Sequence, residues 1–99
     1  MILIEITVYV RDDEMERPQG EAVGVVQLPF VPVDGMLFMS PSDPDFDMKL
    51  SDVMYDFRKQ MLTGALADIA NDDEIDRVIK GWEDIGFAWK RHVDEDSTE

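Results

Sequence analysis

The first ten residues alternate between apolar side chains at even positions and mixed side chains at odd positions. Ile2, Ile4, Ile6, Val8 and Val10 would all lie on one side of an extended chain. These even positions hold only β-branched residues, which pack well in a sheet. We therefore predict a half-buried strand over residues 2–10, at the centre of its sheet.

A second β-rich run follows after a polar connection. Residues 12–20 contain several acidic side chains, a Pro and a Gly, which is typical of a connection. The second run covers about residues 21–33. Because Pro29 and Pro32 cannot donate ladder hydrogen bonds, this run must bend or lie at a sheet edge.

The dipeptide Asp34-Gly35 is typical of a two-residue type I′ hairpin turn. It predicts that residues 36–40 return as a strand beside the second run. Residues 41–47 combine two Pro, one Ser and three Asp, so we expect a loop there.

Past this loop the apolar residues recur every three or four positions, with one adjacent pair, as on an amphipathic helix. The stripe consists of Leu50, Val53, Met54, Phe57, Met61, Ala65 and Ile69. Gly64 would weaken such a helix by about 1 kcal/mol relative to Ala. We therefore predict a helical segment over about residues 51–70, with a break near Gly64.

The last third of the chain fits two patterns. Ile75, Val78, Trp82 and Trp89 belong to a helical stripe, whereas residues 85–93 alternate as in a strand. Two glycines would lie inside the helix, so we favour a hairpin that turns at Glu83-Asp84, with strands 75–82 and 85–93. The helix remains the open alternative.

These elements predict an α+β fold. We expect a single small domain over residues 1–93, with a mostly antiparallel sheet of four to five strands and the helical segment packed on one face. The content of hydrophobic residues, 44%, is enough for a core. Residues 94–99 are polar and acidic, and we expect a disordered tail.

The charge balance restricts the partners. The chain has 23 acidic and 9 basic residues, a formal net charge of −14. Such a surface repels phosphates, so we expect no direct nucleic-acid binding. No apolar run is long enough to span a membrane, and no signal peptide is recognisable. The absence of Cys suits a reducing cytoplasm, where we expect the protein to lie.

Motifs for catalysis or metal binding are incomplete. Asp43, Asp45 and Asp47 alternate as at the start of a calcium loop, but Met48 and Met54 occupy the places of the required Gly and Glu. The single His, His92, has no recognisable nucleophile beside it. We therefore expect no catalytic residues, no metal site and no cofactor, and predict that the protein is not an enzyme.

Protein binding is the function that these features favour. We expect a small module of the inhibitor, immunity or nucleic-acid-mimic type that recognises a basic partner surface. Its candidate residues are Asp43, Asp45, Asp47, Asp72, Asp73 and Glu74 as carboxylates, with Trp82 and Trp89 as apolar anchors. The alternatives are an accessory or structural subunit whose acidity serves solubility, and a weak divalent-metal-binding protein. A homodimer would require a contact face that is locally neutral.

Overall fold

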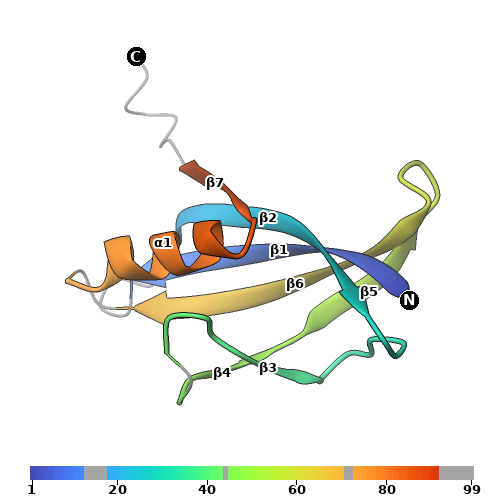
Figure 1. Cartoon of the computed structure of the whole chain (residues 1–99), viewed down its shortest axis with the longest axis horizontal. Helices are drawn as coiled ribbons and strands as arrows, with labels where there is room; N and C mark the ends of the chain where they lie inside the picture. Colours follow the sequence, from blue (N-terminus) through green and yellow to red (C-terminus); the bar gives the residue numbers. More distant parts are fainter. Residues whose placement is uncertain (13–17, 44, 71–72, 92–99) are drawn as a thin grey trace.

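In the computed structural model, which describes residues 1–12, 18–43, 45–70 and 73–91, a five-stranded mixed sheet forms the centre of the molecule (Figure 1). The strand order is β5-β6-β1-β2-β7, and β3 and β4 form a separate two-stranded sheet. The elements are β1 (Ile2–Asp12), β2 (Pro18–Leu28), β3 (Leu37–Met39), β4 (Asp47–Lys49), β5 (Ser51–Asp56), β6 (Met61–Ala70), α1 (Ile75–Asp84) and β7 (Ala88–Arg91).

The predicted first strand is confirmed, and it is central. β1 pairs with β2 in antiparallel and with β6 in parallel orientation, so that Thr7 lies opposite both Val23 and Ala65. The remaining pairs, β5 with β6 and β2 with β7, are antiparallel. The fold class is therefore confirmed as α+β, with a mostly antiparallel sheet.

One face of the large sheet carries the core. The even-numbered side chains of β1 from Ile4 to Val10 are at most 2% exposed. They pack with Val78 and Trp82 of α1, with Met48 of β4 and with Leu50. The helix and the small sheet therefore cover the same face, which we call the inner face; Figure 1 shows α1 lying across β1 and β2.

The prediction of a hairpin at Asp34-Gly35 is wrong. Gly35 has φ +90°, but Asp34 is not in the left-handed region, as a type I′ turn requires. The turn is closed by the Met36 N–H, which donates to the Val33 carbonyl at 3.3 Å. β2 ends at Leu28, before the two prolines, and β3 pairs with β4 rather than with β2.

The helix predicted over residues 51–70 is also wrong, because this segment forms the β5–β6 hairpin. On β6 the side chains of Leu66, Asp68 and Ala70 are buried, and so is Gly64. This period of two defines a strand, whereas Met54 and Phe57 from the predicted helical stripe are 61% and 85% exposed.

The predicted hairpin over residues 75–93 is a helix followed by a strand. Val78 and Trp82, four residues apart, bury the same face of α1. Gly86 ends the helical region with φ +99°, a conformation that favours glycine, and its N–H donates to the Glu83 carbonyl at 3.0 Å. Of the predicted strand over residues 85–93, Ala88–Arg91 form β7, whereas Ile85 and Gly86 belong to the end of the helix.

Two sequence expectations lie outside the described residues: most of the connection over residues 12–20, and the acidic tail over residues 94–99. β2 begins at Pro18, which shortens that connection. In the described part of the chain, no helix has the length and apolar content needed to cross a bilayer.

Candidate functional site

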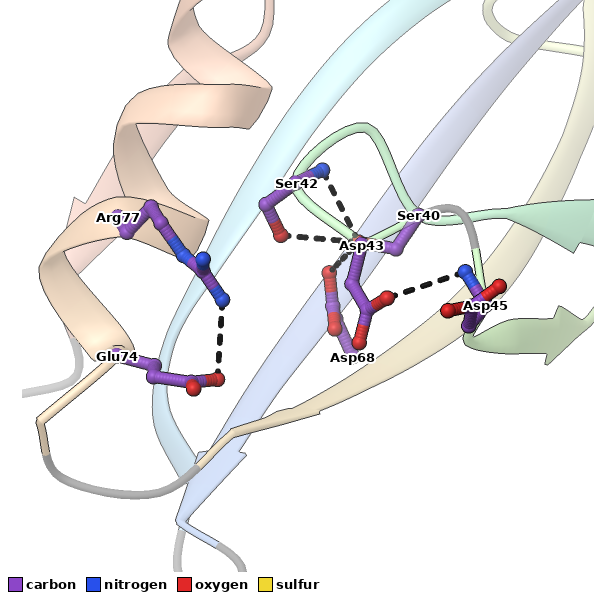
Figure 2. A network of polar contacts seen from close by, with 7 residues as sticks. All are labelled: Ser40, Ser42, Asp43, Asp45, Asp68, Glu74 and Arg77. Atoms are coloured by element: carbon purple, nitrogen blue, oxygen red, sulfur yellow. Dashed lines mark hydrogen bonds and ion pairs between the residues drawn. The ribbon is translucent and has the colours of Figure 1, made fainter.

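The predicted aspartates Asp43 and Asp45 lie in a tight loop between β3 and β4, and Asp47 is the first residue of β4. Asp43, Asp45 and Asp47 are all exposed. The Asp43 Oδ1 atom accepts a hydrogen bond of 3.0 Å from the Asp45 N–H, as Figure 2 shows, and the Asp43 carbonyl accepts one of 3.1 Å from the Phe46 N–H. These bonds hold the loop in one conformation and leave its carboxylates facing solvent.

The remaining predicted carboxylates precede the helix. Asp73 is exposed, and Glu74 occupies the N-cap position of α1. The Glu74 carboxylate forms an ion pair of 3.1 Å with Arg77, one turn further along (Figure 2). Asp72 lies outside the described residues. The loop and the helix start therefore belong to the same layer, on the inner face of the sheet.

The β3–β4 loop is in close contact with the helix α1. A Cβ atom at Gly81 would lie 3.3 Å from the Ser42 Cβ atom, so this position leaves little space for a side chain. In the sequence, Gly81 was one of the two glycines that argued against a helix. In the structure, its lack of a side chain lets the loop approach α1.

Beneath the loop lies a buried carboxylate that the sequence reasoning missed. Asp68 of β6 is 2% exposed, and its Oδ2 atom accepts hydrogen bonds of 2.9 Å from the Ser40 hydroxyl and of 2.9 Å from the Trp82 indole N–H. Ser40 and Asp68 appear together in Figure 2. Each of these three residues comes from a different part of the chain, so this cluster joins the β3–β4 loop, the sheet and the helix.

Burial raises the pKa of Asp68, the hydrogen bonds from Trp82 and Ser40 lower it, and the nearby charge of Asp43 raises it further. The net direction is upward, because desolvation of the charged form is the largest cause. We assign this cluster a structural role, since both donors are directed at one enclosed oxygen.

The two predicted tryptophan anchors do not project from this layer. Trp82 is 3% exposed and packs against Phe87, with ring centroids 4.9 Å apart, so its predicted role as an exposed anchor is wrong. Trp89 is half-buried beside Gly20, where an added Cβ would lie 2.6 Å from the indole ring. Exposed apolar side chains occur instead at Leu37 and Met39 of β3, which are 59% and 68% exposed.

The charged side chains of the described residues are unevenly distributed between the two sides of the sheet. We define the acidic layer as residues 34–49 and 73–84, the segments that cover the inner face. It carries nine acidic and three basic side chains. The acidic members are Asp34, Asp43, Asp45, Asp47, Asp73, Glu74, Asp76, Glu83 and Asp84, and the basic ones are Lys49, Arg77 and Lys80.

The opposite face of the large sheet has a balanced charge. We define the open sheet face as the side chains that β1, β2, β6 and β7 direct away from α1. The strand registers place two acidic and two basic residues there, Glu5, Glu21, Arg11 and Lys90. Lys59, from the β5–β6 turn, forms an ion pair with Glu5. Among the residues that the structure describes, the excess of acidic over basic side chains is therefore larger in the acidic layer than on the open sheet face.

Two more acidic side chains lie outside the acidic layer. Asp52 and Asp56 lie on β5, where the Asp56 Oδ1 atom accepts hydrogen bonds from the Arg58 and Lys59 N–H groups in the following turn. His92 lies outside the described residues. Within residues 1–12, 18–43, 45–70 and 73–91, no group of three acidic or histidine side chains has the arrangement of a metal site.

Comparison with protein-family models, with curated proteins and with solved structures finds no significant match to this chain.

Proposed function

We propose that the protein binds a partner protein through the acidic layer, and that the partner presents a basic surface. The observation that supports this proposal is the excess of carboxylates, nine acidic against three basic side chains, in the acidic layer among the described residues. Acidity that served only solubility would need no such arrangement, whereas a one-sided charge steers an oppositely charged partner into a defined orientation.

The loop between β3 and β4 is the centre of the proposed interface. Its carboxylates at Asp43 and Asp45 are exposed, and hydrogen bonds within the loop reduce the conformational entropy that binding would otherwise cost. Leu37 and Met39 on the adjoining strand take the role of apolar anchors. Exposed apolar side chains next to charged ones are a common composition for an interface.

The test is a pull-down from the source organism with the immobilised chain, at low and at high salt, followed by calorimetry with each captured protein. We expect binding to a basic partner to weaken at least about tenfold between 0.05 and 0.5 M NaCl, because salt screens charge attraction. Affinity that is insensitive to salt would contradict the proposal and favour an accessory subunit held by apolar contacts.

Paired variants separate the acidic layer from overall charge. Asp43→Asn with Asp45→Asn removes two charges from the loop and retains the Oδ1 acceptor of Asp43. Asp52→Asn with Asp56→Asn removes two charges from β5 and retains the Oδ1 acceptor of Asp56. We expect only the first pair to weaken binding, by about fivefold or more. Equal effects would show that net charge, not the layer, governs binding.

A further inference from the structure

The open sheet face is more apolar than a solvent-facing sheet surface usually is. An antiparallel sheet that exposes one face to water usually carries polar side chains on that face. Here nine of the sixteen outward side chains are apolar, and the outward positions of β6 carry no charge. These apolar residues are Leu3, Tyr9, Val23, Val25, Met61, Ala65, Ala67, Ile69 and Ala88.

No described helix or strand covers this face. Val25 is 51% exposed, Ile69 46% and Leu3 43%, whereas Ile4, Asp68 and Ala70, which neighbour two of them on the inner face, are buried. Across the middle of the face the side chains of Ala65, Thr7, Val23 and Ala88 lie side by side, and none of them is long or charged. A weakly polar sheet face with short side chains permits the close approach of another sheet.

Charge indicates which partner suits this face. Two copies of a chain with a net charge of −14 repel each other wherever their acidic layers meet. On the open sheet face the acidic and basic side chains of the described residues balance, so a second copy can approach there with the acidic layers directed outward. In this arrangement the two sheets lie between the two acidic layers. Charges are screened over about 8 Å at physiological salt, so the layers repel each other only weakly across that distance.

The size of the face is adequate for a dimer. The four strands of this face, spaced about 4.8 Å apart and with central strands about 30 Å long, give a face of roughly 580 Å². A standard specific interface buries about 800 Å² on each partner. The sheet can therefore supply most of a stable interface.

We propose that the protein forms a symmetric homodimer in which the open sheet faces of two copies pack as a two-layered β-sandwich. Each copy then presents its acidic layer on the outside of the dimer. This inference does not depend on the proposed basic partner, because the two interactions use opposite sides of the molecule and respond to salt in opposite directions.

Sedimentation equilibrium of the full chain tests the proposal. We expect dimers with a dissociation constant in the micromolar range and a dissociation constant that falls severalfold from 0.05 to 0.5 M NaCl, since salt screens repulsion between the acidic copies. A chain that stays monomeric at about 200 μM in high salt, or a dimer that dissociates as salt rises, would overturn the proposal.

Charge substitutions locate the interface. Val25→Glu and Met54→Glu add a carboxylate on or beside the open sheet face, and Leu37→Glu and Met39→Glu add the same charge on β3. All four side chains are at least half exposed, so each monomer should fold, which circular dichroism verifies. We expect the first pair to raise the dissociation constant at least about tenfold and the second pair by less than about threefold. Equal effects from both pairs would refute this interface.

Discussion

The indole N–H of Trp82 donates a 2.9 Å hydrogen bond to the carboxylate of Asp68, fourteen residues earlier in the chain. The same oxygen accepts the hydroxyl of Ser40, twenty-eight residues earlier still. One buried atom thus joins the helix, a central strand and the loop that carries the acidic candidates. The stability of the acidic layer should depend on this contact.

Removal of the Asp68 carboxylate should destabilise the protein. Asp68→Ala leaves the Trp82 N–H buried and unpaired and removes the bond from Ser40, which should lower the free energy of unfolding by about 2 kcal/mol or more. Asp68→Asn should cost less, because both donors meet a single oxygen that an amide carbonyl can replace. Urea denaturation of both variants measures this, and equal losses would contradict a role as hydrogen-bond acceptor.

The raised pKa of Asp68 predicts a dependence of stability on pH. The folded state holds the Asp68 proton more tightly than the unfolded state, where the pKa is near 3.8. This group therefore stabilises the fold increasingly as the pH falls through its folded pKa and toward the unfolded value. We expect the stability of the native chain relative to Asp68→Asn to increase as the pH falls from about 7 to about 4. The comparison cancels the titration of the other carboxylates, and a constant difference would exclude a raised pKa.

Gly24 should resist substitution. A Cβ atom there would lie 2.6 Å from the Phe87 ring, which packs on Trp82. We expect Gly24→Ala to lower the free energy of unfolding by about 1–3 kcal/mol through overpacking. In a Phe87→Ala background the same change should cost at least about 1 kcal/mol less. Gly81→Ala, with a longer contact of 3.3 Å, is the milder comparison.

Gln60 should gain from replacement by glycine. It has φ +56° in the β5–β6 turn, a conformation that strains most side chains. We expect Gln60→Gly to raise the free energy of unfolding by up to about 1 kcal/mol in thermal or urea denaturation. Asp52→Gly, at φ +57°, should gain less, because aspartate adopts this conformation more readily. A larger gain at Asp52 would contradict the argument from strain.

The candidate site could be predicted only in part. The carboxylates over residues 43–47 could be identified because three aspartates stand at alternate positions in the sequence. Asp68 was not, since its segment also matches a helical stripe and an isolated aspartate gives no sign of burial. Trp82 was expected on the surface because the sequence does not show that a carboxylate fourteen residues away would accept its N–H.

The sequence by itself determined the central strand, because five β-branched residues at alternate positions bury one face of β1 in any sheet. It also determined the acidity. The predicted α+β class is correct, although the helix lies at Ile75–Asp84 and not over residues 51–70. Only the tertiary structure decided that residues 51–70 form a hairpin. The inner face of β6 includes Gly64 and Asp68, which look unsuitable for a core until Leu50 fills the space at the first and Ser40 and Trp82 bond to the second. Those partners come from distant segments, so the local pattern of β6 could not reveal them.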